Sequence, residues 1–223
     1  MIPWVLLDTA IVPGDGGEMR LYQHDRDFSI RVGNYELMNN RLHSSEDELA
    51  LIVCKRMNKP DARVLIGGLG MGFTLAAVLQ ELGPKGKVVQ AELVPAVVRW
   101  NRGPLAHIAG NPLADRRVIV KEDDVARVIR ESPDTFDAIL LDVDNGPVGL
   151  TAEKNNWLYG LPGLQASYDA LRPKGLLAIW SSGPDDAFTK RLRKTGFESE
   201  QVRIRGRGSA GGPRYLIWVA KRP

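Results

Sequence analysis

Cysteine and histidine are scarce in this sequence of 223 residues. Cys54 is the only cysteine, which excludes an intrachain disulfide and a zinc site built on several cysteines. The three histidines, His24, His43 and His107, do not have the spacing of metal ligands relative to one another. The sequence therefore predicts no metal centre.

Long hydrophobic runs and a large excess of one charge are also lacking. No stretch reaches the ~18 apolar residues of a membrane span, and the N-terminal MIPWVLLDTA has no basic residues before its short apolar stretch. We therefore expect neither a membrane partner nor a signal peptide, and a cytoplasmic protein. The 30 Lys and Arg residues against 27 Asp and Glu residues are too evenly balanced to indicate a nucleic-acid partner.

Glycine, in contrast, is concentrated in the stretch RVLIGGLGMGFTLAA. Its VLI run is typical of a parallel strand buried on both faces, and a helix is expected to begin near Gly72. Between them, Gly68, Gly70 and Gly72 allow the backbone to turn tightly and to approach a ligand. The spacing GxGxG is not the dinucleotide fingerprint, which would need glycine in place of Phe73, and the GK[ST] of a phosphate-binding Walker loop is absent. A glycine-rich turn without a ligand is the alternative.

Acidic residues follow several of the predicted strands. Glu92 ends VVQAE, 20 residues after the last glycine of the loop, close to the spacing of an acid that binds ribose hydroxyls. Asp123 and Asp124 follow the next strand, and Asp142 and Asp144 follow FDAILL, the most apolar strand. Because the carboxyl ends of parallel strands meet at one edge, these acids favour a nucleoside with a positively charged group over a polyphosphate. The alternative for each one is a solvated acid at a strand end.

The pattern of short segments changes after about residue 43. Residues 1–43 alternate apolar and polar residues between turn sequences, which predicts a small antiparallel β-meander. Ser45 and Glu48 form a capping-box pattern that would open a helix ending near Met57. Residues 44–223 then alternate strands and helices, which predicts a doubly wound α/β domain with a mostly parallel, seven-stranded sheet.

The expected elements of this domain are short. Its strands are predicted at residues 64–66, 88–92, 117–120, 136–141, 176–180, 200–204 and 215–220. Its later helices are predicted at residues 75–82, 94–101, 125–131, 164–171 and 187–194. Since no helix separates the last two strands, the final strand should run antiparallel to its neighbour.

Four of these stretches, SSEDELA, VLIGGLGMG, EDDV and FDAILLDVDNGP, resemble motifs of the class I S-adenosylmethionine-dependent transferases. Within that class the chain is similar to the spermidine synthase-like family over about residues 31–221. The resemblance implies a class I methyltransferase-like fold. It also implies that Glu92 binds ribose, that Asp124 lies near adenine and that Asp142 is the catalytic aspartate.

The chain departs from the family pattern at several positions. Met71 stands where the family's glycine loop usually carries an aspartate that holds the donor's amine. Leu42 stands at the position of an expected glutamine, and Leu51 begins a replacement of the family's tyrosine-histidine-glutamate. These departures concern the specific reaction more than the nucleoside site.

The resemblance implies transfer of an alkyl group, aminopropyl in spermidine synthases, from S-adenosylmethionine or decarboxylated S-adenosylmethionine to an amine or another small-molecule acceptor. Asp142 would bind the cationic amine and take its proton, with help from Asp144. A small-molecule methyltransferase is the alternative, because Met71 would not repel the carboxylate of intact S-adenosylmethionine. A nucleoside-binding protein without catalysis is the third hypothesis, and a homodimer is left open.

Two further features have competing interpretations. The arginines of RIRGRGSAGGPR, Arg205, Arg207 and Arg214, would hold an anionic group if this loop closes over the ligand, or they belong to a solvated hairpin. The aromatic residues Trp157, Tyr159 and Trp180 would line an acceptor pocket or pack in the core.

Overall fold

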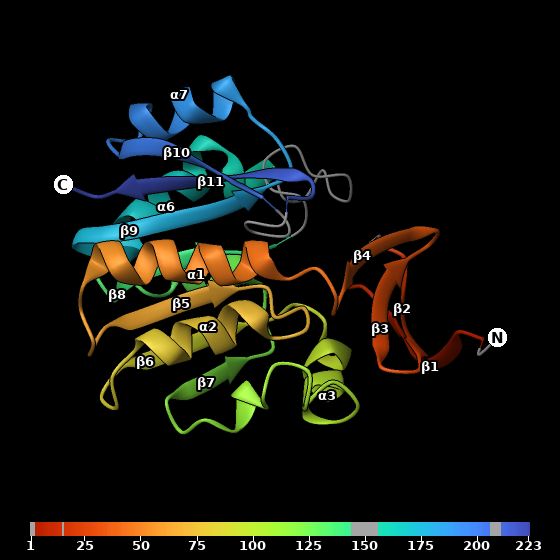
Figure 1. Cartoon of the computed structure of the whole chain (residues 1–223). Helices are drawn as coiled ribbons and strands as arrows, with labels where there is room; N and C mark the ends of the chain where they lie inside the picture. Colours follow the sequence, from red (N-terminus) through yellow and green to blue (C-terminus); the bar gives the residue numbers. More distant parts are fainter. Residues whose placement is uncertain (1–2, 15, 144–155, 206–210) are drawn as a thin grey trace.

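The computed structural model describes residues 3–14, 16–143, 156–205 and 211–223, which form two sheets of unequal size (Figure 1). The smaller sheet is the predicted β-meander. Its four antiparallel strands lie in sequence order and are β1 (Val5–Ile11), β2 (Glu18–His24), β3 (Asp27–Val32) and β4 (Tyr35–Asn39).

The larger sheet has the predicted seven strands, in the order β10-β11-β9-β8-β5-β6-β7. They are β5 (Arg63–Gly67), β6 (Lys87–Ala91), β7 (Val118–Lys121), β8 (Phe136–Leu141), β9 (Leu171–Ser181), β10 (Glu198–Arg205) and β11 (Arg214–Lys221). The five strands from β5 to β9 pair in parallel, and β11 is antiparallel to both of its neighbours. Every residue of β8 is buried, and this strand is the central one, as its apolar sequence predicts.

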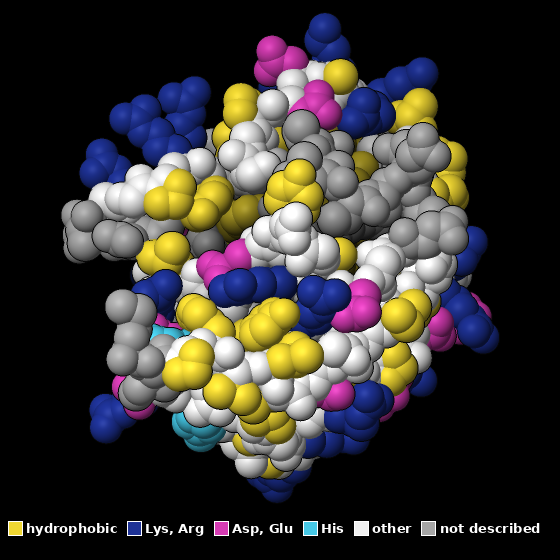
Figure 2. All heavy atoms as spheres, turned by 90° about the vertical axis from the view of Figure 1, so that its right-hand side faces the viewer, with side chains coloured by type: hydrophobic (Ala, Val, Ile, Leu, Met, Phe, Trp, Pro, Cys, Tyr) yellow, Lys and Arg dark blue, Asp and Glu magenta, His cyan; other side chains and the backbone are white. Residues whose placement is uncertain are grey.

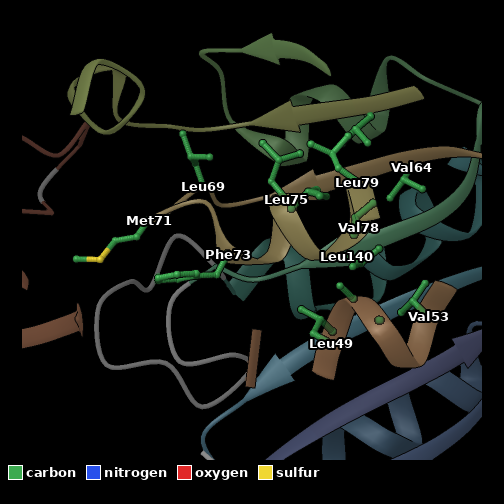
Figure 3. Close-up of a cluster of buried hydrophobic side chains, with 14 of the residues drawn as sticks. Leu49, Val53, Val64, Leu69, Met71, Phe73, Leu75, Val78, Leu79 and Leu140 are labelled. Carbon is green, nitrogen blue, oxygen red and sulfur yellow. The ribbon is translucent and has the colours of Figure 1, made fainter. Parts of the chain in front are cut away.

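Helices cover both faces of this sheet, and they are α1 (Ser44–Met57), α2 (Phe73–Glu81), α3 (Pro95–Arg102), α4 (Val125–Arg130), α5 (Asn156–Tyr159), α6 (Leu161–Ala170) and α7 (Asp186–Lys194). On one face, Leu49 and Val53 of α1 point toward Leu140 of β8 and toward α2 (Figure 3). Side chains of α4, α6 and α7 form a second core on the other face. The sequence predicts every helix of this domain except α5.

The predicted capping box at the start of α1 is wrong. The helix begins at Ser44, its N-cap residue is His43, and no side chain caps it. The hydroxyl of Ser45 instead donates a 2.5 Å hydrogen bond to the Glu46 carboxylate. Ser45 is therefore the second residue of the helix and does not occupy the N-cap position, where its hydroxyl oxygen would accept a hydrogen bond from a backbone N–H.

The small sheet lies at the edge of the large sheet where the parallel strands end (Figure 1). Trp100 of α3 donates a 2.7 Å hydrogen bond from Nε1 to Asp8 of β1, and the ring of Phe28 in β3 meets His107 edge-on. Figure 2 views the molecule from this side and shows hydrophobic side chains among charged ones. Large exposed hydrophobic residues of β1 and β4 are Val5, Leu6, Leu7, Ile11, Tyr35 and Leu37.

Candidate functional site

The glycine loop connects β5 to α2 at the carboxyl edge of the large sheet. Gly68 and Gly72 adopt φ angles of +87° and +85°, which side chains other than glycine rarely adopt. A Cβ atom on Gly68 would collide with the backbone carbonyl of Asp142, and one on Gly70 would lie 2.6 Å from Sδ of Met38. The loop is therefore packed between the end of β8 and strand β4 of the small sheet.

Glu92, which follows β6, is bound to this loop through its carboxylate. Its Oε2 accepts a 2.8 Å hydrogen bond from the backbone N–H of Leu69, and its Oε1 accepts one of equal length from Val94. The side chain is only 8% exposed. An acid after the strand that follows a glycine loop is the group that binds ribose hydroxyls in dinucleotide-binding folds. The structure thus brings Glu92 and the glycine loop together, as the spacing predicts.

Two buried amide side chains that the sequence analysis did not identify hold the carbonyl groups of the loop. Nε2 of Gln90 donates to the carbonyl of Gly68 at 2.9 Å, and Nδ2 of Asn101 donates to that of Gly70 at 2.8 Å. Both residues are at most 1% exposed. A glutamine within the apolar strand VVQAE was the one signal available for this role. These two bonds fix the direction in which the loop's peptide groups point.

The acids after β7 have local structural roles. Asp124 is the N-cap of α4, and its Oδ1 accepts a 2.8 Å hydrogen bond from the backbone N–H of Ala126. Asp123 accepts a hydrogen bond from the Asp124 N–H and lies 3.6 Å from the guanidinium of Arg127. Capping explains an aspartate at position 124 without a ligand. The adenine role of Asp124 and the cofactor-binding role of Asp123 stay predictions.

Asp142 lies directly after the central strand and is partly buried. Its Oδ2 accepts a 2.6 Å hydrogen bond from the hydroxyl of Thr74, and its backbone N–H donates to the carbonyl of Gly67. Burial raises the pKa of its carboxyl group above the usual range, and the hydrogen bond from Thr74 opposes that shift. Gly67 of β5 therefore holds the backbone of Asp142 beside the glycine loop, and Thr74 of α2 holds its side chain.

A second carboxyl group, that of Glu46 in the first turn of α1, interacts electrostatically with Asp142. Burial and the charge of Asp142 together raise the pKa of Glu46 to about 7. The sequence analysis did not identify Glu46, although its spacing of three residues from the apolar Leu49 places it on the same side of the helix.

Several predicted residues fall elsewhere. Asp144 and Arg207 lie outside the described residues. Arg205 of β10 and Arg214 of β11 lie opposite each other in the register of these two antiparallel strands. Tyr159 donates a hydrogen bond to the carbonyl of Val143 and packs against a phenylalanine of α7, which favours the packing role.

The other two aromatic residues differ in position. The ring of Trp157 lies under the guanidinium of Arg130 at 4.8 Å. The ring of Trp180 contacts that of Tyr215 at a centroid distance of 4.9 Å, on the face of the sheet that carries Asp142. Trp180 thus lies on the same face of the sheet as the predicted catalytic residue.

Two kinds of feature are not found in the described ranges 3–14, 16–143, 156–205 and 211–223. No helix there is long and apolar enough to cross a membrane. No three side chains of His, Cys, Asp or Glu there gather in a way that would hold a metal ion.

Comparison with known families gives a match over most of the chain. Residues 47–185 match the model of the spermine/spermidine synthase domain. This range contains the glycine loop, Glu92 and Asp142. No curated protein matches the sequence.

Comparison with solved structures shows the same fold. The spermidine synthase of Thermotoga maritima superposes with a TM-score of 0.77 at 18% identity, over 98% of this chain and 73% of that one. A spermidine synthase in complex with the transition-state analogue AdoDATO gives 0.74 at 18% identity, over 98% and 72%. The 1,6-didemethyltoxoflavin-N1-methyltransferase of Burkholderia thailandensis, with bound S-adenosylhomocysteine, gives 0.57 at 21% identity, over 81% and 79%.

Proposed function

Because the chain belongs to the spermine/spermidine synthase family, we propose that it transfers an alkyl group from an S-adenosylmethionine-type sulfonium donor to a small-molecule acceptor. One observation supports this most: the glycine loop, Glu92 and Asp142 come from three separate strands and meet at one edge of the sheet. The similar structures with AdoDATO and S-adenosylhomocysteine bind ligands of this chemical type. Transfer of an aminopropyl group to an amine is the specific reaction we propose.

The residues of the site fit such a donor. The carboxylate of Glu92 lies beside the loop, where it would accept hydrogen bonds from the ribose hydroxyls. Gly68, which lacks a side chain, brings the backbone of the loop against the end of β8, so that a nucleoside bound on the loop would lie next to Asp142. The donor supplies an electrophilic carbon and a neutral thioether leaving group, so the protein mainly has to orient the reactants and exclude water.

Asp142 would act as the general base for an amine acceptor. An amine with a pKa of about 10.4 is protonated at neutral pH and must lose a proton before its lone pair can attack. Attack forms the new C–N bond, the C–S bond breaks, and its electron pair stays on sulfur. The carboxylate of Asp142, oriented by Thr74, would bind the ammonium group and accept its proton.

A methyltransferase is the second candidate, and Met71 is the observation that favours it. The side chain of Met71 is fully buried at the position where the resemblance places an aspartate for the donor's amine. Without a carboxylate there, the carboxylate of intact S-adenosylmethionine would not be repelled. A nucleoside-binding protein without catalysis stays the third hypothesis.

Calorimetric titration with S-adenosylmethionine, decarboxylated S-adenosylmethionine and methylthioadenosine tests this proposal. Binding of methylthioadenosine together with a preference for the decarboxylated donor is expected for aminopropyl transfer, and a preference for intact S-adenosylmethionine indicates the methyltransferase. Preferential binding of NAD would contradict both. Turnover is then assayed with the preferred donor against polyamines and small aromatic amines, and binding without any turnover would support the third hypothesis.

A further inference from the structure

The sheet-facing side of α1 places Glu46 above the end of β8. Leu49 and Val53 of α1 point toward Leu140 in Figure 3. Glu46 precedes Leu49 by three residues, so it lies on the same side of the helix, one turn nearer the N-terminus. Asp142 follows Leu140 by two residues and therefore continues the same face of β8. The hydrogen bond from Thr74 of α2 to Asp142 confirms that face.

Within the described part of the chain, the groups that interact with these two carboxyl groups are not cationic. Ser45 donates to Glu46 and Thr74 donates to Asp142. The titratable groups that act electrostatically with Glu46 are Asp142, Asp47 of its own helix and Tyr215 at the start of β11. Among the described residues, neither Glu46 nor Asp142 forms an ion pair with a lysine, arginine or histidine.

Two other charged side chains of α1, those of Asp47 and Arg56, have partners elsewhere. Asp47 lies 2.8 Å from Nδ1 of His43. Arg56 pairs with Glu200 of β10, about ten residues and roughly 15 Å along the helix from Glu46. Two carboxylates close together in a poorly solvated site cannot both stay ionised without a cation.

We propose that Glu46 is a positioning residue for Asp142, such that the two carboxyl groups share one proton in the free protein and release it to water when a cationic ligand group enters. This inference rests on the proposed transferase function, which supplies the cation as the donor's sulfonium or the acceptor's ammonium group. Asp142 then becomes fully charged only when the site is filled, which couples the availability of the base to ligand binding.

Titration of side-chain carboxyl signals by carbon NMR tests the pairing without any ligand. In the unmodified protein, the signals of Glu46 and Asp142 should each show two coupled steps. In Glu46→Gln, Asp142 should lose its proton in a single step, at a pH lower by roughly one unit. Unchanged titration of Asp142 in this variant would overturn the proposal.

Asp47→Asn is the matched control, because Asp47 lies on the same helix turn but faces His43. This variant should keep the two coupled steps. If the titration of Asp142 moves to lower pH as far in Asp47→Asn as in Glu46→Gln, the effect is a general one of removing negative charge. That outcome would contradict a specific pair.

Binding of a charged and a neutral ligand tests the link to function. S-adenosylmethionine carries the sulfonium charge and S-adenosylhomocysteine does not. The ratio of their affinities should rise roughly tenfold between pH 6 and pH 8 in the unmodified protein, and less than about twofold in Glu46→Gln. The same pH dependence in both proteins would overturn the proposal. If neither ligand binds, the proposed function fails, and the NMR titration alone decides the role of Glu46.

Discussion

The hydroxyl of Thr74 donates a 2.6 Å hydrogen bond to Oδ2 of Asp142, which joins the first turn of α2 to the end of β8. The two residues are 68 positions apart in the sequence. They meet because β5 and β8 are neighbours in the sheet and the glycine loop returns the chain over the end of β8. The orientation of the predicted base thus depends on a residue of the nucleoside-binding loop region.

Thr74→Val should shift the pH profile of turnover to higher pH. Valine keeps the shape of the side chain but removes the donor that favours the ionised form of Asp142, so the pKa of Asp142 rises further. The acidic limb of the kcat/KM profile should shift upward by roughly 0.5 to 1 pH unit. Thr135→Val is the control, since the hydroxyl of Thr135 donates to the nearby carbonyl of Pro133 and not to a carboxylate.

Asp142→Asn should reduce turnover with an amine acceptor by roughly 10² to 10⁴, the usual contribution of a positioned general base. The variant keeps the size of the side chain but loses charge and basicity, so nucleoside affinity should fall much less. Steady-state kinetics and calorimetry measure the two effects separately. Asp186→Asn, at an exposed position in α7, is the control. Full turnover in Asp142→Asn would make Asp142 structural and favour a methyltransferase whose acceptor needs no base.

Glu92→Ala should weaken the binding of either donor by on the order of 1.5 to 3 kcal/mol, the range for a hydrogen bond to a charged group. The structure adds a second effect, because the backbone N–H groups of Leu69 and Val94 lose their acceptor. Each unsatisfied group destabilises the fold by about 1–3 kcal/mol unless water replaces the carboxylate.

Calorimetry with methylthioadenosine and urea unfolding separate the two effects of Glu92→Ala. Glu122→Ala, at an exposed position, should change neither the affinity for methylthioadenosine nor the free energy of unfolding. Unchanged affinity for methylthioadenosine in Glu92→Ala would remove Glu92 from the nucleoside site.

The stability of the protein should fall between about pH 5 and pH 7.5. The folded protein raises the pKa of Glu46 from 4.5 to about 7, so it binds this proton more tightly than the unfolded chain does. This contribution is fully present below the unfolded pKa and is lost as the pH rises through the folded pKa. The expected loss is on the order of 2 kcal/mol of unfolding free energy.

Urea unfolding at a series of pH values measures this loss. In Glu46→Gln the free energy of unfolding should fall less over the same range, because glutamine does not titrate and only Asp142, whose pKa is also raised by burial, still contributes. Asp115 and Asp137, whose pKa values are lowered, titrate mainly below this pH range and therefore do not change the slope that is compared. Equal slopes in the two proteins would contradict the assignment of the raised pKa to Glu46.

Local patterns in the sequence were enough to predict the fold. Alternation of apolar strands with helices determines a parallel sheet, and glycines 68, 70 and 72 mark the turn after β5. Since the carboxyl ends of parallel strands share one edge, the positions of Glu92 and Asp142 beside that turn also follow from the sequence. The capping-box prediction failed because the helix begins at Ser44, so Ser45 lies inside the first turn and not at the N-cap position.

Tertiary packing decided which side chains surround those two acids. Thr74 and Glu46 reach Asp142 only because α1 and α2 are packed over β8, with Leu49 and Val53 directing one side of α1 to the sheet. No local pattern contains the rotation of a helix about its axis relative to a strand nearly a hundred residues away. That rotation follows from burying the apolar side of α1, and it brings a carboxyl group of the first turn with it.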